Sequence, residues 1–272
     1  MVAAVALGGA LFAQGRLESS AQVRGDSDHL LYLPSGRLLK VLDLGYSEVL
    51  ADLVYLWSIQ YYGNYPGGVR YDYLLQIYDR VITELDPRFA DAYVLGAAIL
   101  SVEAHRPEDA IRLLDKGVRA NPEDWMLPFE AGFVAYHDLH DYPRAAAYFA
   151  TAIERPGVHP VVRRFHAEMF NRAGDRETSR RYWEEILRTA DSDYLRGVAA
   201  RHVHDLTVEI DLAHLREAIA EFIRVHGSNP ADLRDLVRGG LLRVVPVDPD
   251  GRPYVYDRTT GSIARARGRS AP

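Results

Sequence analysis

The feature that most constrains the fold of this 272-residue chain is a set of turns that recur at a nearly fixed spacing. The turns are Leu85-Asp86-Pro87, Ala120-Asn121-Pro122 and Arg155-Pro156, so the prolines lie 35 and then 34 residues apart. Before each turn lie three small, apolar or aromatic residues, of which the second follows the first by four positions and the third follows the second by three. These sets are Leu74, Tyr78, Val81; Ala110, Leu114, Gly117; and Ala145, Phe149, Ala152, followed by Ser179, Trp183, Ile186 without a closing proline. Self-similarity at one period predicts a row of repeated structural units.

Each block is expected to hold two helices. The residue before a proline avoids the helical region, so Asp-Pro and Asn-Pro end one helix and begin the next. Small residues such as Gly96, Gly132 and Ala145 allow paired helices to approach closely. This pattern, from Leu56 to Asp193, resembles the tetratricopeptide repeat (TPR) family, whose 34-residue unit is a helix–turn–helix, although blocks one and two are shifted by one residue. The resemblance implies an all-α fold, a TPR-like α-solenoid; the alternative is an irregular helical bundle.

The remaining segments differ in character from the repeats. Before them, apolar residues recur at helical steps of three and four over residues 38–56, and the Gly- and Pro-rich stretch 61–68 ends this segment. We therefore expect five parts. They are a signal or membrane-anchor segment with a linker (1–30), an N-terminal helical segment (31–68), the TPR-like repeats (69–209), a C-terminal module (210–262) and a disordered basic tail (263–272).

The amino terminus bears on the compartment. Val2 to Ala13 is an apolar run of about 12 residues, which is short for a membrane span of about 20. It resembles the apolar stretch of a secretion signal, although no Lys or Arg precedes it, and Ser19-Ser20-Ala21 offers small residues for cleavage. A buried or frayed helix is the alternative. We expect a protein of the bacterial envelope, either periplasmic or anchored in the inner membrane facing the periplasm.

The C-terminal module has short strands and turns after one more amphipathic helix. Tyr254-Val255-Tyr256 alternates like a strand, and Asp250-Gly251 and Thr260-Gly261 are turn sequences. The segment resembles the globular half of the major pseudopilins of type II secretion, through Gly227 to Pro230, Leu233 to Leu242, and Asp248 to Tyr256. The polymerising amino-terminal helix of that family is absent here. The resemblance therefore implies a small α+β cap for the repeats and not a pilus subunit.

The pseudopilin resemblance also implies weak candidates for calcium ligands. They are Asp248, Asp250 and Asp257. Calcium takes six to eight oxygen ligands, which three carboxylates and backbone carbonyls can supply. Asp-Gly and Asp-Pro pairs more commonly make turns, and we favour that reading.

Residues for catalysis are not apparent in the sequence. With no cysteine, disulfides, thiolate metal sites and a cysteine nucleophile are excluded. Phosphate-binding and nucleophile-elbow motifs are absent. His137 and His140 lack a reinforcing carboxylate pattern, and acidic pairs such as Glu108-Asp109 lie at expected helix starts. We expect a protein that is not an enzyme and has no cofactor or metal, and a net charge of −6 argues against a nucleic-acid partner.

The TPR resemblance implies a concave groove lined by the first helix of each unit. It places eight residues there: Glu130, Phe133, Tyr136, His137, Arg164, Glu168, Asn171 and Arg172. Aromatic residues and arginine are typical of binding hot spots; the alternative for Phe133 and Tyr136 is packing between helices. The sequence therefore predicts a non-enzymatic interaction scaffold or assembly subunit of an envelope complex, which binds a partner peptide or helix. An accessory component of a type II secretion or type IV pilus-like machine is the alternative, and the N-terminal segment offers a route to membrane association.

Overall fold

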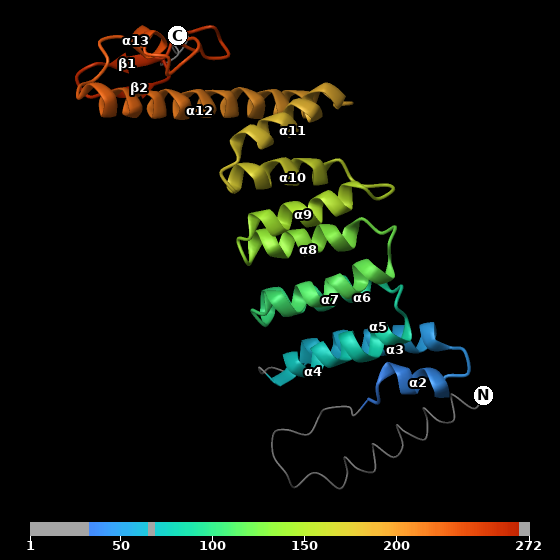
Figure 1. Cartoon of the computed structure of the whole chain (residues 1–272). Coiled ribbons are helices and arrows are strands. Elements are labelled where there is room, and N and C mark those ends of the chain that lie inside the picture. The colour runs from blue at the N-terminus through green and yellow to red at the C-terminus, as the bar shows by residue number, and fades with distance from the viewer. Residues whose placement is uncertain (1–32, 65–68, 267–272) are drawn as a thin grey trace. The chain divides into compact units, whose positions relative to one another are not determined.

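The computed structural model describes residues 33–64 and 69–266, and the chain divides into two compact units, 1–159 and 160–272, which are described separately (Figure 1). The expected signal or anchor segment and the end of the basic tail lie outside the described residues. The helices of the first unit are α2 (Gly36–Leu42), α3 (Ser47–Asn64), α4 (Val69–Ile77), η1 (Tyr78–Ile82), α5 (Thr83–Leu85), α6 (Ala90–Ala98), η2 (Ile99–Glu103), α7 (Pro107–Ala120), α8 (Met126–His137) and α9 (Tyr142–Ile153). The second unit contains α10 (Val161–Arg172), α11 (Arg176–Thr189), α12 (Asp193–His226), α13 (Arg234–Arg238), β1 (Val255–Asp257) and β2 (Ser262–Ala264).

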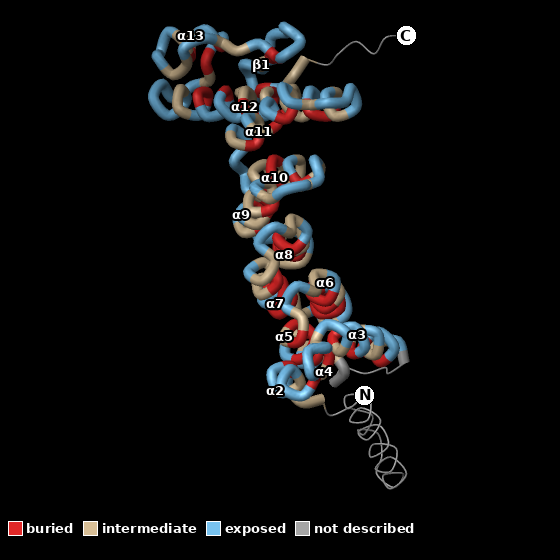
Figure 2. The backbone as a smooth tube through the Cα atoms, turned by 90° about the vertical axis from the view of Figure 1, so that its right-hand side faces the viewer, coloured by how far each residue is buried: buried red, intermediate tan, exposed pale blue. Residues whose placement is uncertain are grey.

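The predicted TPR-like helix hairpins are present in both units. α6 with η2 packs against α7, α8 packs against α9, and α10 packs against α11. Each closing turn falls between helices where the prolines predicted it, and every member of the four repeated residue sets is buried. The tube in Figure 2 shows buried residues on α5, α6, α7 and α8. The all-α fold class is confirmed, with a small two-stranded sheet at the C-terminal end.

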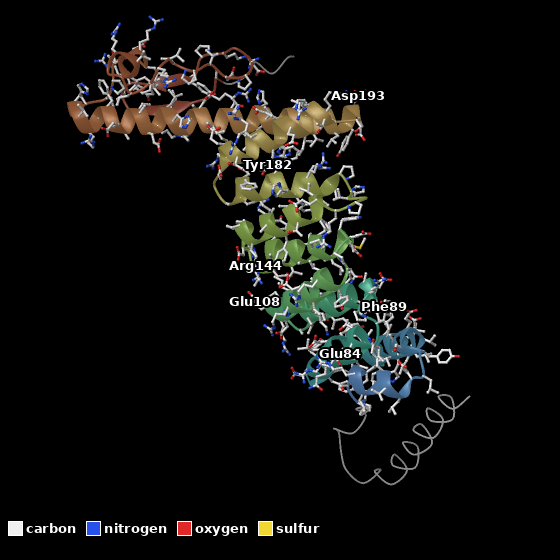
Figure 3. The ribbon with its side chains drawn as sticks, turned by 45° about the vertical axis from the view of Figure 1, so that its right-hand side comes forward. Glu84, Phe89, Glu108, Arg144, Tyr182 and Asp193 are labelled. Carbon is white, nitrogen blue, oxygen red and sulfur yellow. The ribbon has the colours of Figure 1, made fainter. Side chains whose placement is uncertain are left out.

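Hydrogen bonds and ion pairs repeat at the period of the sequence. The side-chain amide of Asn121 donates to the carbonyl of Pro87, 34 residues earlier, at 3.2 Å. Arg155 in turn donates to the carbonyl of Asn121, again 34 residues earlier, at 2.6 Å. Arg144 pairs with Glu108 across 36 residues at 3.0 Å, and Figure 3 labels both side chains. Consecutive repeats are therefore bonded directly to each other near equivalent positions.

Packing between paired helices depends on glycines that face aromatic rings. A Cβ added at Gly132 of α8 would lie 2.7 Å from the ring of Phe149 on α9. A Cβ added at Gly117 of α7 would lie 2.8 Å from the ring of Tyr93 on α6. Real Cβ atoms are not found at these separations, so each ring lies on bare backbone. The same pairing in two hairpins explains why small and aromatic residues recur together in the sequence.

Two π-helical turns account for the single-residue shifts in blocks one and two. η1 continues α4, and η2 continues α6, in the first and second blocks respectively. A π-helical turn widens the helix by one residue per hydrogen-bonded ring, so later side chains rotate relative to an uninterrupted α-helix. Buried residues of η1 such as Tyr78 and Val81 then return to the core.

The N-terminal segment, predicted to be helical from Leu38 onward, contains two helices. They are α2 and α3, separated by a turn at residues 43–46. Leu44 and Gly45 have positive φ angles of 54° and 92°, and Asp43 accepts hydrogen bonds from Gly45 N–H and the Ser47 hydroxyl. This local bonding replaces a helical turn. Polar turn contacts therefore interrupt the helix at a point that the apolar spacing does not mark.

The second unit contains a long helix that the sequence predicted only in part. We expected an amphipathic helix from Leu212 to Ile223, but α12 runs for 34 residues. It ends at Gly227 in the left-handed conformation, with φ of 71°. The expected boundary between residues 209 and 210 therefore falls inside a continuous helix.

The C-terminal module packs against the second half of α12. β1 and β2 pair antiparallel, with Tyr256 opposite Ile263. Tyr254, Ile263 and Leu236 are buried with Leu215 and Ile219 of α12 in one hydrophobic cluster. The predicted strand near residues 254–256 is therefore present, and its apolar residues cover this half of α12.

We predict that Gly132→Ala lowers the free energy of unfolding, by up to about 2 kcal/mol. Overpacking against the buried Phe149 ring costs roughly 1–3 kcal/mol, and this exceeds the gain of about 1 kcal/mol expected from alanine in a helix. Urea denaturation measures the change. Gly197→Ala on α12 is the matched control, because the nearest atom to an added Cβ is the end of the Arg201 side chain at 3.9 Å. That variant should be as stable as the natural chain or more stable. A Gly132→Ala protein with undiminished stability would contradict the close packing.

Candidate functional site

A row of aromatic rings runs along one face of α8. Trp125, Phe129, Phe133 and His137 are four residues apart, so a helix places them on one side. Consecutive ring centroids are separated by 6.0, 6.4 and 5.7 Å, and the rings of Phe133 and His137 are nearly parallel at 6°. We call these four residues the aromatic row of α8.

The aromatic row leads from the core of the first unit to its surface. Phe129 lies 5.7 Å from the buried ring of Phe149, whereas 37% of Phe133 is exposed and His137 is exposed as well. Tyr136 is half-buried, with its ring 6.1 Å from Phe133 and 6.3 Å from Tyr142. Rings held by one another but open to solvent on one side lose little entropy when a partner covers them.

The predicted groove residue Glu130 has an unusual environment. It lies on α8, its side chain is half-buried, and burial raises the pKa of its carboxyl group. The sequence analysis assigned Glu130 to the groove but did not predict the burial of its carboxyl group. The predicted groove set also left out Trp125 and Phe129, although their spacing of eight and four residues from Phe133 placed all three on one helix face.

The other four predicted groove residues lie on α10, in the second unit. Arg164, Glu168 and Asn171 are half-buried, and Arg172 is exposed. Arg172 Nε donates to Glu168 at 2.9 Å, and the Asn171 amide reaches the same carboxylate at 3.5 Å. Glu168 is therefore engaged within its own helix. Since the two sets belong to separate units, a groove shared by both sets stays a prediction.

An apolar surface lies on α2, α3 and the turn between them. Residues spaced as a helix core are exposed there, and they include Leu38, Val41, Leu42, Leu44, Tyr46, Val49, Leu53 and Leu56. On α3, Val49, Leu53 and Leu56 form a stripe on the side opposite the buried residues Ala51, Val54 and Ser58. We call this set the α2–α3 apolar face. Monomeric proteins rarely expose continuous apolar patches of this kind unless something covers them.

The three weak calcium candidates do not act as one group. Asp248 Oδ2 accepts from Arg265 Nε at 3.1 Å, and Asp250 Oδ2 accepts from Arg265 Nη2 at 2.8 Å. The same Nη2 lies 3.0 Å from His204 Nε2 on α12. Asp257 instead accepts from Thr259 N–H and the Thr260 hydroxyl in the turn after β1. A guanidinium is thus the cation that Asp248 and Asp250 hold.

The environment of Asp248 keeps it ionised. Its side chain is 1% exposed. Burial alone would raise the pKa of Asp248, but hydrogen bonds from Arg252 N–H and Arg265, with the charge of Arg265, outweigh it and hold that pKa below its ordinary value. These contacts connect the loop at 248–252 with the residue after β2.

Histidines and acidic residues do not gather into a larger cluster in the described part of the chain. Across residues 33–64 and 69–266, no group of three or more His, Asp or Glu side chains is arranged to hold a metal ion. His202 stacks on Trp183 with ring centroids 3.9 Å apart, and burial lowers the pKa of its imidazole. His137 contacts the adjacent Asp138 at 2.8 Å. No helix among the described residues combines the length and apolar character required to cross a membrane.

Comparisons with known proteins give distant structural likenesses. No protein-family model matches the chain, and no curated protein matches it significantly. The crystal structure of MamA is 14% identical over 51% of this chain and 87% of that chain, with a TM-score of 0.35. The crystal structure of TTC0263, a thermophilic TPR protein in Thermus thermophilus, is 19% identical over 62% of this chain and 96% of that chain, with a TM-score of 0.37. Because both likenesses are distant, the assignment of TPR-like hairpins depends on the contacts described above.

We predict that Asp248→Asn lowers the thermal stability of the second unit at pH 7 and that the deficit closes in acid. An acid whose pKa is lowered in the folded state contributes stability above its unfolded pKa, and this contribution is lost as pH falls through the folded pKa. The melting temperatures of the two proteins should therefore converge below about pH 3.8, the ordinary value. Scanning calorimetry across pH measures the difference. Arg265→Ala should remove much the same stability, and the double variant should lose little more. Full additivity of the two changes would show that the ion pair contributes nothing.

Proposed function

We propose that this protein is a non-enzymatic scaffold that binds a peptide or helix of another protein on the aromatic row of α8. The observation that carries the proposal is the exposure of Phe133 and His137, stacked at the outer end of the row. A partner that covers these rings buries apolar area, and the rings already hold one another in place. The stacking within α8 means that binding requires no rearrangement of the helix.

The α2–α3 apolar face supports an assembly role for the same protein. Apolar side chains that are exposed on a folded chain favour permanent association, because burial of apolar surface contributes about 25 cal/mol of free energy for each Å². Tyr46, Val49, Leu53 and Leu56 provide such a surface at a place in the sequence different from α8. We therefore propose a subunit with two separate contacts, one for a transient segment and one for a neighbouring subunit.

We further propose that the assembly belongs to the bacterial envelope. The support is the apolar run from Val2 to Ala13 in the sequence, which resembles a secretion signal. Fractionation of cells that express the full chain tests the compartment. Recovery with the periplasm or the inner membrane agrees with the proposal, and recovery in the cytosol alone contradicts it.

A second candidate is an accessory component of a type II secretion or type IV pilus-like machine. The specific observation is the C-terminal module, where a helix, a Leu-rich loop and the strand after Asp248 follow the order of the pseudopilin globular half. Co-purification with secretion or pilus components favours this candidate. The outcome of this test does not affect the proposal that the aromatic row of α8 binds a partner, since either assembly could use that row.

Position-specific photo-crosslinking tests the binding role. A photoreactive phenylalanine analogue at Phe133 should yield adducts of discrete mass in the native host, identifiable by mass spectrometry. Tyr194 on α12 is the matched control, because it is an aromatic residue that is 72% exposed and lies outside the row. We expect Phe133→Ala with His137→Ala to reduce co-purification of the crosslinked partner at least tenfold.

Stability separates binding from folding in this experiment. Phe133 is partly exposed, so the double variant should lose no more than about 1–2 kcal/mol of unfolding free energy. Adducts of the same masses from positions 133 and 194, or full retention of the partner by the double variant, would refute a binding role for the row. Unfolding of the double variant would instead assign both rings to the core.

A further inference from the structure

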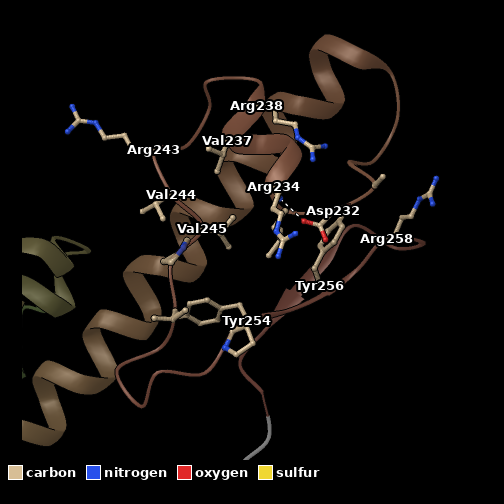
Figure 4. Close-up of a pocket in the computed structure, with 15 residues that line it drawn as sticks. Asp232, Arg234, Val237, Arg238, Arg243, Val244, Val245, Tyr254, Tyr256 and Arg258 are labelled. Carbon is tan, nitrogen blue, oxygen red and sulfur yellow. Dashed lines mark hydrogen bonds between the residues drawn. The ribbon is translucent and has the colours of Figure 1, made fainter.

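The C-terminal module contains a hollow that neither the aromatic row nor the α2–α3 apolar face uses. It has a volume of about 760 Å³ and is lined by α13, the loop at 243–247 and the strand β1 with its flanking residues (Figure 4). Its apolar lining includes Leu233, Val237, Val245, Tyr254 and Tyr256. Leu233 and Tyr254 are buried, so this part of the lining belongs to the fixed hydrophobic cluster on α12.

Arginines surround this apolar lining. Arg234, Arg238, Arg243 and Arg258 contribute to the hollow, and Asp232 is the one acidic residue among its lining. All four arginines are exposed. In a chain whose net charge is −6, a hollow with four cations and one anion is a local exception. An acidic ligand would be attracted to it from solution.

Most of these guanidinium groups lack an internal partner. Arg238 pairs with Asp235 at 2.8 Å. Within the part of the chain that the structure describes, Arg234, Arg243 and Arg258 pair with no carboxylate. Figure 4 shows the Arg234 and Arg238 side chains near each other, with Arg243 and Arg258 on opposite sides of the view. The arrangement thus leaves cations on several sides of one apolar depression.

Arg234 and Arg238 are also four residues apart on α13, so they share a helix face. Two like charges at this spacing on a helix repel each other. A carboxylate bound between them would remove this repulsion. The planar guanidinium fork matches a carboxylate through two parallel hydrogen bonds, which a lysine cannot reproduce.

We propose that this hollow binds an acidic peptide segment of a partner protein, with an apolar side chain in the depression and flanking carboxylates on the arginines. A peptide fits because it alternates charged and apolar groups at the spacing of a few residues. A free phosphate would engage one or two arginines and leave the apolar lining in water. Single-stranded nucleic acid needs exposed aromatic rings for stacking, whereas Tyr254 is buried and Tyr256 is half-buried.

A membrane surface fits the hollow less well than a peptide does. Peripheral membrane sites present a convex apolar face or a cluster of basic residues toward the lipid. Here buried apolar residues line a depression, although Val244, which also lines it, is 71% exposed. We therefore treat binding to anionic vesicles as a competing outcome of the test.

Fluorescence anisotropy with the full-length chain tests the proposal. The probe is a labelled ten-residue peptide composed of glutamate and leucine, compared with peptides in which glutamine replaces glutamate or serine replaces leucine. We expect saturable binding of the acidic apolar peptide in 50 mM NaCl and at least tenfold weaker binding in 500 mM NaCl. Both substituted peptides should bind at least tenfold more weakly.

Charge reversal locates the binding site. Arg234→Glu with Arg258→Glu should weaken binding at least tenfold, since both positions then repel the peptide. Arg188→Glu is the matched control, because this exposed arginine of α11 lies outside the hollow and has no ion pair among the described residues. It should bind the peptide like the natural chain.

Three results would overturn the proposal: equal binding by the double variant, equal binding of the glutamine peptide, or no binding of the acidic peptide. Sedimentation with phosphatidylglycerol vesicles in the absence of peptide binding would assign the arginines to a membrane contact instead. If the double variant fails to fold, Arg243→Glu in the loop provides the same test at one exposed position. None of these residues belongs to the aromatic row, so failure here leaves the function proposed for α8 untouched.

Discussion

The repeat architecture depends on aromatic rings that lie directly on helix backbone. Phe149 contacts the backbone at Gly132, and Tyr93 contacts it at Gly117, which allows the axes of paired helices to approach more closely than any larger residue would permit. The rings fill the space between helices, and hydrogen bonds such as Asn121 to Pro87 then align one hairpin with the preceding one. The closing prolines end the last helix of each repeat, so that the first helix of the following repeat can begin.

The site proposed on α8 lies where the packed helix pair borders on solvent. On α8, small residues such as Gly132 face the partner helix, and the aromatic row runs from Phe129, beside Phe149 of α9, to the exposed rings of Phe133 and His137. The hydrophobic contrast along α8 is therefore weak, since both faces are apolar. The outer end of the row, at Phe133 and His137, is open to solvent, and for this reason we propose it as a contact with another protein.

Much of the fold could be predicted from the sequence because repetition multiplies a weak signal. Leu114 or Trp183 alone says little, but twelve buried positions at matching offsets specify the hairpins. The break at Leu44 could not be predicted in this way, because it depends on the side chain of Asp43 bonding its own turn. The length of α12 was missed although no proline interrupts residues 193–226, because the regular apolar spacing becomes clear only toward the end of the helix.

The candidate sites were predicted less completely than the fold. The TPR resemblance placed Phe133 and His137 in a groove, but the helical spacing over residues 38–56 cannot tell an exposed stripe from a buried one, so it did not show that the α2–α3 apolar face lies on the surface. The arginines of the hollow come from α13, a loop and a turn, so only the folded chain brings Arg234 and Arg258 to one depression. The partner of Asp248 was equally hidden, since Arg265 lies 17 residues later in a stretch expected to be disordered.

The hydrogen bonds of Arg265 give the last described residues of the chain a role in holding the C-terminal module together. One guanidinium group joins the 248–250 loop, the strand β2 that precedes it, and His204 on α12. A truncation immediately after β2 would therefore remove the contacts through which Arg265 connects the 248–250 loop to α12. A fusion tag placed there could disturb the same contacts. Expression clones of this protein should retain the residues around Arg265.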